Sequence, residues 1–187
     1  MHSFLKNNIF SISLGTTLSK FAGFLRQLLI APLFGLGLVY DAYNYAYIVP
    51  SFLIIIIGGI NGPLHNSIVA VLTPVKDIKA RQILQNISLK VILLLSIIAI
   101  LIFFNSELII KIVGPNLDKE TKLNAVRQLE ILSPCIPLAG FNGLSYGALN
   151  SKNKFFISSI SPIIVSTVTI IFIAMYWFFN LKNQIFN

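Results

Sequence analysis

The charged residues of this chain are separated by long uncharged runs. No Asp, Glu, Lys or Arg occurs in residues 42–75, 131–151 or 155–181. A bilayer core about 30 Å thick needs about 20 apolar residues in helical conformation, and each run can hold at least one such helix. Hydrophobic residues make up 56% of the chain and charged residues 11%, which leaves too few polar side chains for a water-exposed surface. The sequence therefore predicts an all-α integral membrane protein.

Apolar segments and their polar boundaries predict about five transmembrane helices in one helical lobe over residues 1–187. The second predicted span contains Gly58-Gly59-Ile60-Asn61-Gly62-Pro63, a run that should break the helix and that membrane proteins tolerate where it lines a cavity. Asp41 is the expected N-cap of that span, and Pro134 and Pro137 should kink the fourth span. The predicted spans are 9–35, 41–73 with a break at 58–63, 83–104, 129–149 and 155–179.

The charges of the connecting loops predict a cytoplasmic N-terminus. With that orientation, the basic residues inside outnumber the one acidic residue, Asp77. The outside stretch between the third and fourth spans holds equal numbers of basic and acidic residues. Cytoplasmic loops carry an excess of Lys and Arg, which supports this orientation. The inside basic residues are Lys6, Lys76, Lys79, Arg81, Lys152 and Lys154.

Two basic residues, Lys20 and Arg26, lie in the middle of the first predicted span. A charged side chain near the bilayer centre costs roughly 2.5–3.5 kcal/mol, so such residues usually face a bundle interior or water. At 100° per residue, Lys20 shares one stripe with Gln27, and Arg26 shares an adjacent stripe with Ser19. Either this strip binds an anion, with Arg giving bidentate phosphate contacts, or the two cations are structural, by snorkelling or by pairing with Asp41.

Three further polar residues are candidates for substrate binding. Asp41 is either a helix cap or the partner of a first-span cation. Asn61 and His65 follow the glycine-rich break. His65 titrates near physiological pH and so could couple transport to protons. The alternative is a hydrogen bond between helices, the more frequent role of a lone intramembrane histidine.

Sequence patterns of enzymes and of metal or nucleic-acid sites are missing. We find no Ser-His-Asp arrangement, paired catalytic carboxylates, Walker loop or GxGxxG, and the single cysteine, Cys135, has no CxxC or His neighbour. The net charge of +8 comes from short loops rather than from a basic stripe, so it reflects topology rather than polyanion binding. We expect no enzymatic activity, no cofactor, no metal and no nucleic-acid partner.

Three segments in one order resemble the MurJ (MviN) family of lipid II flippases, within the multidrug/oligosaccharidyl-lipid/polysaccharide exporter superfamily. The first is Thr17–Gln27, followed by Phe34-Gly35 and Asp41-Ala42-Tyr43, which is similar to the start of the family's first two helices. Gly147–Phe155 resembles the stretch after the family's fourth helix. The turn at Gly62–His65 lies where the family has a glycine in its second helix. Together these segments cover nearly the whole chain.

The resemblance implies a multi-pass protein of the bacterial plasma membrane. Such a protein moves the undecaprenyl-pyrophosphate-linked peptidoglycan precursor to the outer leaflet by alternating access. It also implies that Ser19, Lys20 and Arg26 form the first-helix phosphate site and that Asp41 matches the acid of the second helix. Lys20 departs from the family's usual Arg, so bidentate geometry is lost there.

A second departure is the uncharged stretch 50–57, where the family offers another Arg. Either the phosphate site of this chain is incomplete, or part of phosphate binding moves to Asn61 and His65. The family has two lobes, so we expect this chain to be most of one lobe, as a fragment, a split-gene product or a truncated reading frame. Its expected partners are the lipid-linked pyrophosphate and membrane lipids and, for a split-gene product, a second polypeptide that supplies the missing helices.

Two alternatives stay open: another exporter of the superfamily (a polysaccharide-lipid flippase or a drug/cation antiporter), or a non-transporting membrane remnant. An antiporter would use intramembrane acids, and only Asp41 lies near the deep end of a span. In the tertiary structure we expect Lys20 and Arg26 to point toward a helix-lined groove that contains the Gly58–Pro63 break.

Overall fold

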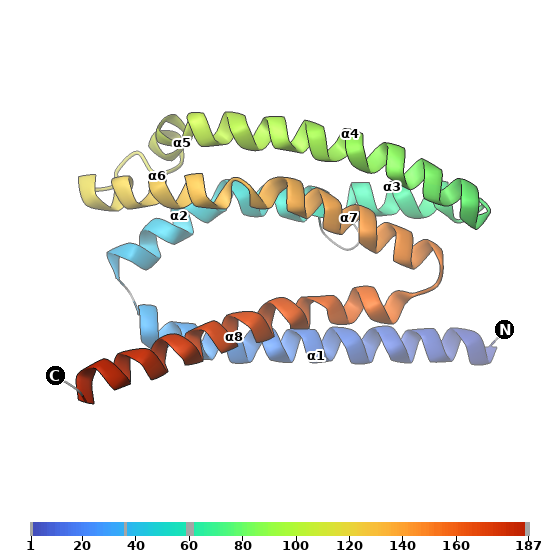
Figure 1. The fold of residues 1–187 in the computed structure, drawn as a ribbon, viewed down its shortest axis with the longest axis horizontal. Coiled ribbons are helices and arrows are strands. Elements are labelled where there is room, and N and C mark those ends of the chain that lie inside the picture. The colour runs from blue at the N-terminus through green and yellow to red at the C-terminus, as the bar shows by residue number, and fades with distance from the viewer. Residues whose placement is uncertain (1, 36, 59–61, 186–187) are drawn as a thin grey trace. The chain divides into compact units, whose positions relative to one another are not determined.

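The computed structural model describes residues 2–35, 37–58 and 62–185, and in these ranges all regular structure is helical (Figure 1). The described helices divide into two compact units. Helices α1 and α8 form the first unit, and helices α2 to α7 form the second. Each unit has its own packing and is described by itself.

The first unit is a pair of long parallel helices. Helix α1 spans His2–Phe34 and α8 spans Phe155–Ile185, and they pack along their length (Figure 1). Gly15 lies opposite Ser159, and Gly23 lies opposite Ser166. Because the residue numbers rise on both helices from the first of these contacts to the second, α1 and α8 run in the same direction.

The second unit packs six α-helices and one π-helical turn around two small apolar clusters. Its larger cluster includes Ala42 and Ala46 of α2, both fully buried, together with Ala125 and Leu129 of α6. Small side chains at these positions let α2 and α6 approach closely. The elements are α2 (Leu38–Leu53), the π turn η1 (Ile54–Gly58), α3 (Pro63–Leu72), α4 (Asp77–Phe104), α5 (Ser106–Val113), α6 (Lys119–Leu132) and α7 (Cys135–Ser151).

The predicted break within the second span, at 58–63, agrees with the helix ends that the structure describes. Helix α2 passes into the π turn, and α3 begins as a separate helix at Pro63, with extended Gly62 as its N-cap. Proline suits the first helical position because its missing N–H would have no partner there. Residues 59–61, which include the predicted site residue Asn61, lie outside the described residues.

The predicted N-cap of the second span is wrong. Asp41 is not the N-cap of α2: extended Gly37 is, and its carbonyl accepts from the N–H groups of Tyr40 and Asp41 at 2.9 and 3.0 Å. Asp41 lies instead in the first turn, where a carboxylate still complements the helix dipole. Helix α4, Asp77–Phe104, contains the whole third predicted span, 83–104, and its polar first turns are also helical.

The fourth predicted span, 129–149, is not one kinked helix. It is divided between α6 and α7 at Ser133-Pro134. Pro134 has no N–H for the carbonyl of Glu130, and the Ser133 hydroxyl donates to that carbonyl at 2.9 Å instead. Pro137 likewise cannot bond the Ser133 carbonyl, which accepts from the Ile136 N–H at 3.1 Å. Two prolines three residues apart therefore end one helix and start another.

The polar stretch before this break is largely helical. It contains α5 and most of α6, whose N-cap is Asp118. The Asp118 carboxylate accepts from the N–H groups of Glu120 and Thr121 at 3.1 and 3.0 Å. Hydrogen bonding by Thr121 is the main reason that the pKa of Asp118 lies below its ordinary value.

Three of the described helices are long and apolar enough to cross a membrane. They are Leu38–Ile57, Asp77–Phe104 and Phe155–Phe178, with mean hydropathies of 1.2, 2.9 and 2.2. They correspond to the second, third and fifth predicted spans. Helix α1, which carries Lys20 and Arg26, and helix α7, with 17 residues, are not among these three. The all-α membrane class is confirmed.

Candidate functional site

The face of α1 that packs on α8 is a narrow stripe of mostly small residues. Partly or fully buried positions follow the spacing of one helix face, and at 100° per residue they fall within an arc of about 120°. Arg26 lies near the middle of this arc. The protected positions are Gly15, Thr16, Ser19, Ala22, Gly23, Arg26 and Ile30.

Gly15 and Ser19 bring the backbones of α1 and α8 together. A Cβ atom at Gly15 would lie 2.9 Å from Ser159 Cβ, so any larger residue would force α1 and α8 apart. One turn later the Ser19 hydroxyl lies 2.6 Å from the carbonyl oxygen of Ser159 and 2.8 Å from that of Gly15. Small residues and interhelical hydrogen bonds of this kind associate helices in lipid, where hydrophobic burial gives no driving force.

Arg26 is the charged residue on this stripe. Its Nε atom is buried and has no hydrogen-bond partner among the described residues. Leaving a buried donor of a charged group unsatisfied is costly, so the position is more consistent with an external anionic partner than with packing. Ser19 and Arg26 share the stripe, as their predicted spacing requires.

Lys20 lies on a different side of α1. It is exposed and falls about 100° around the helix from Ser19. Arg26 therefore belongs to the face of α1 that packs on α8, whereas Lys20 lies on an exposed side of α1. Two positive charges of one helix thus have different surroundings.

His65 lies in the first turn of α3 and is buried, with 4% of its surface exposed. Its Nε2 atom is 2.8 Å from Nδ2 of Asn150 on α7, and its Nδ1 atom is 3.0 Å from Oδ1 of Asn66. The prediction of an interhelical hydrogen bond is confirmed. Beside it, a Cβ atom at Gly147 would lie 2.7 Å from Ile68 Cβ, so α3 and α7 also meet at a glycine.

The predicted site residues are distributed over both units. Ser19, Lys20 and Arg26 belong to the α1–α8 unit, whereas Asp41, which is exposed, and His65 belong to the other. The expected groove that joins Lys20 and Arg26 to the glycine break stays a prediction.

Sequence reasoning missed two partners, Ser159 and Asn150. Asn150 lies within the segment Gly147–Phe155 that carried the family resemblance, but the sequence offered no role for it. Ser159 had no signal of its own. It contributes a backbone carbonyl, which any residue type carries.

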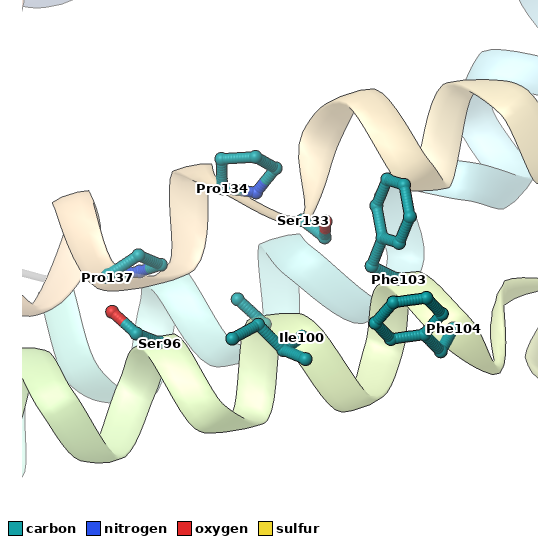
Figure 2. A pocket seen from close by; sticks show the side chains of 8 residues that line it. Ser96, Ile100, Phe103, Phe104, Ser133, Pro134 and Pro137 are labelled. Atoms are coloured by element: carbon teal, nitrogen blue, oxygen red, sulfur yellow. The ribbon is translucent and has the colours of Figure 1, made fainter.

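A shallow apolar hollow of about 250 Å³ lies where α4 meets the α6–α7 break. Figure 2 shows the two prolines on one side and Phe103, Phe104 and Ile100 on the other. The lining carries no charged side chain, so the hollow does not suit a pyrophosphate. Its lining residues are Ser96, Ala99, Ile100, Phe103, Phe104, Ser133, Pro134 and Pro137. The described residues also contain no group of three or more potential metal ligands.

The fold defines the class first: a polytopic, all-α membrane protein with a broken second helix and a basic residue held in its first helix pair. A family model described as "Lipid II flippase MurJ" matches residues 30–184. The chain belongs to the MurJ lipid II flippase family. The matched region begins after Ser19, Lys20 and Arg26, so the evidence for these three is their own geometry and the resemblance of their segment.

Individual relatives agree with the family model. The chain is 37% identical over 160 residues to "Probable lipid II flippase MurJ" of Synechocystis, covering 86% of this chain and 30% of that protein. It is 33% identical over 159 residues to "Lipid II flippase MurJ" of Thermosipho africanus, covering 85% and 33%. It is 30% identical over 171 residues to "Probable lipid II flippase MurJ" of Buchnera aphidicola subsp. Schizaphis graminum, covering 88% and 33%.

The chain spans about a third of the length of these curated relatives. No solved structure matches it.

Proposed function

We propose that this chain forms most of one lobe of a lipid II flippase in the bacterial plasma membrane. In this proposal residues 1–187 are a single lobe with about five spans and a cytoplasmic N-terminus. Family membership and the basic residues of the predicted inside loops support it. The protein is a transporter rather than an enzyme, and the names of the relatives favour this family over other exporters of the superfamily.

The observation that supports the substrate class is the buried Nε of Arg26, which has no hydrogen-bond partner among the described residues. It lies on α1, which this proposal places in the membrane. Ionisable residues within membrane segments usually mark a substrate or ion pathway. A guanidinium is suited to phosphate because its planar donors give bidentate contacts. Arg26 therefore binds the pyrophosphate of a lipid-linked precursor, and exposed Lys20 adds a point charge.

The remaining candidate residues have different roles in this proposal. The Ser19 hydroxyl is engaged with two backbone carbonyls, so Ser19 holds α1 against α8 beside Arg26 rather than contacting phosphate. Both ring nitrogens of His65 are engaged, so His65 acts through the helices it joins. Asp41 and Asn61 stay candidate substrate-binding residues of this proposal, and no contact with Arg26 is assigned to them.

Alternating access requires two halves around a site near the bilayer midplane. Transport is therefore proposed for this chain together with helices equivalent to those that complete its relatives. They could belong to the same polypeptide or to a second one, and no comparison supports a second polypeptide.

Complementation tests the function. The chain is joined to the remaining helices of the Synechocystis relative and expressed in cells depleted of their own lipid II flippase. We expect the fusion to restore growth, and Arg26→Gln to abolish that rescue because the bidentate phosphate contact is lost. Arg81→Gln is the matched control: it removes the same charge from an exposed residue at the start of α4 and should leave rescue intact.

The proposal is wrong if a well-expressed, membrane-inserted fusion carrying both Lys20→Ala and Arg26→Gln still rescues growth. Immunoblots of membrane fractions establish that each variant accumulates to the same level. A wild-type fusion that inserts well but never rescues would favour another exporter or a non-transporting remnant.

A further inference from the structure

His65 is held between two amide side chains at the start of α3. This helix begins at Pro63, directly after the glycine-rich break, so His65 is in the first turn that follows the break. The ring is buried, with 4% of its surface exposed. Asn66 holds one ring nitrogen from the same helix, and Asn150 holds the other from α7.

The hydrogen-bond partners define the protonation of the ring. An amide nitrogen can only donate, so Nδ2 of Asn150 donates to Nε2 of His65 over 2.8 Å, and Nε2 carries no proton. The Nδ1–H group then donates to Oδ1 of Asn66 over 3.0 Å. Both nitrogens are satisfied when the ring is neutral and protonated at Nδ1.

Glycine packing brings Asn150 within reach of the ring. A Cβ atom at Gly147 would lie 2.7 Å from Ile68 Cβ and 3.0 Å from the backbone oxygen of His65. His65 faces Asn150, and Ile68, one turn further along α3, faces Gly147, so the two helices cross antiparallel with matched one-turn spacing. The short Asn150 side chain can reach His65 only because α7 lies this close to α3.

The last described element before α3 is a π-helical turn. Helix α2 ends in the π turn Ile54–Gly58, and π-helical turns are frequent at functional sites. Hinges are usually a few residues at the ends of elements that absorb large backbone changes. Among the described elements, a clamped α3 leaves the π turn as the place for such a change.

We propose that Asn150 is a positioning residue of the flippase: through His65 it fixes the first turn of α3 against α7, so that α3 and α7 move as one body during transport. Its role in transport rests on the function proposed above. The clamp itself is a property of this chain and can be tested without transport.

The first test is the ring tautomer, measured by nitrogen NMR on the chain labelled at histidine in lipid nanodiscs. The chain has two histidines, and His2→Gln leaves His65 as the only signal. We expect a protonated Nδ1 and an unprotonated Nε2. Asn150→Asp should move the proton to Nε2 because a carboxylate only accepts, and Asn150→Ala should abolish the single-tautomer spectrum.

Matched controls use Asn142, an exposed asparagine on the same helix. Asn142→Asp and Asn142→Ala should leave the spectrum of His65 unchanged. A wild-type ring protonated at Nε2, or a spectrum indifferent to both Asn150 variants, overturns the clamp. The wild-type spectrum decides this even if an Asn150 variant fails to fold.

The second test is transport in the complementing fusion. Asn150→Ala should reduce lipid II translocation about tenfold at unchanged membrane level, the upper range for loss of one hydrogen bond, and Asn142→Ala should not. Full transport by Asn150→Ala overturns the positioning role even when the tautomer is as expected. A wild-type fusion that fails to rescue while the ring shows the expected tautomer refutes the proposed function and leaves the clamp standing.

Discussion

The α1–α8 pair and the α3–α7 pair pack in the same way but differ in how their buried polar groups are satisfied. Each pair meets at a glycine where a Cβ atom would clash, and each has a polar hydrogen bond close to that glycine. In α1–α8 the bond joins a side chain to a backbone carbonyl and leaves Arg26 Nε unsatisfied on the same face. In α3–α7 it joins two side chains and satisfies both nitrogens of His65.

In the proposed function, this difference separates a side chain that binds a ligand, Arg26, from one that holds two helices together, His65. A buried polar atom without a partner retains its capacity to bind, at a cost in stability. A buried polar atom with all its partners gives rigidity and specificity instead. The sequence predicts both Arg26 and His65 to be ionisable residues of membrane spans. Only their partners in the structure distinguish them.

The largest expected effect is that of Gly147→Ala. The new methyl group meets Ile68 Cβ and a backbone oxygen, which can move only with the helix. We expect a loss of about 1–3 kcal/mol in the free energy of unfolding, measured by denaturant titration in detergent micelles. Gly23→Ala is the control, because its Cβ would meet only Ser166 Oγ, at 4.0 Å. Equal effects of the two substitutions would contradict the close α3–α7 approach.

Gly15→Ala should have a somewhat smaller effect. Its Cβ would meet Ser159 Cβ at 2.9 Å and the Ile160 backbone nitrogen at 3.4 Å, so the α1–α8 contact must widen slightly. We expect a loss of about 1–2 kcal/mol. Spin labels on α1 and α8 should report a longer interhelical distance. An unchanged distance together with unchanged stability would refute this packing.

Arg26→Met should stabilise the chain while abolishing rescue. It removes a buried donor that has no partner, which we expect to raise the free energy of unfolding by about 1 kcal/mol. Lys20→Met, at an exposed position, serves as the comparison and should change stability less. Destabilisation by Arg26→Met would show that the guanidinium is satisfied within the protein and would remove the main argument for an anion site.

Ser19→Ala removes the interhelical hydrogen bond to Ser159. Such bonds in membranes average about 0.6 kcal/mol, so we expect a loss of that size in thermal or denaturant unfolding. The control is Ser145→Ala, since that hydroxyl bonds Phe141 within its own helix at 2.8 Å. If both variants behave alike, the hydrogen bond between α1 and α8 contributes nothing measurable.

The smallest effect is expected at Asp118, outside both helix pairs. Its pKa is lowered in the folded chain by hydrogen bonding from Thr121, so its stabilisation of α6 is present above the unfolded pKa. The stabilisation is lost as the pH falls through the folded value, below about pH 4. Amide chemical shifts of Glu120 and Thr121 should report this loss. Asp118→Asn keeps an N-cap acceptor without titrating and should show no such change.

Part of the fold follows from local sequence. Three glycines and a proline in 58–63 predicted the separation of α2 and α3, because their effect on a helix is local. The same reasoning placed the N-cap at Asp41, but an extended glycine four residues earlier takes that position. It also treated Pro134 as a kink, although Pro137 removes a second N–H and completes the break.

The candidate site was less accessible from sequence than the fold. Helical periodicity correctly placed Ser19 and Arg26 near each other on α1, since both lie on one helix. It could not distinguish the surroundings of Arg26 from those of Lys20, because these depend on where α8 packs. His65 was found as a candidate, but the choice between proton coupling and an interhelical bond required its partner.

The sequence by itself determined that this is a helical membrane protein, because the spacing of its charges and the length of its apolar runs leave no other way to satisfy the backbone in lipid. Only the tertiary structure decided which polar groups are satisfied. Ser19 and Ser159 are 140 residues apart, and His65 and Asn150 are 85 residues apart. Hydrogen bonds over such separations depend on helix packing, which no local pattern encodes.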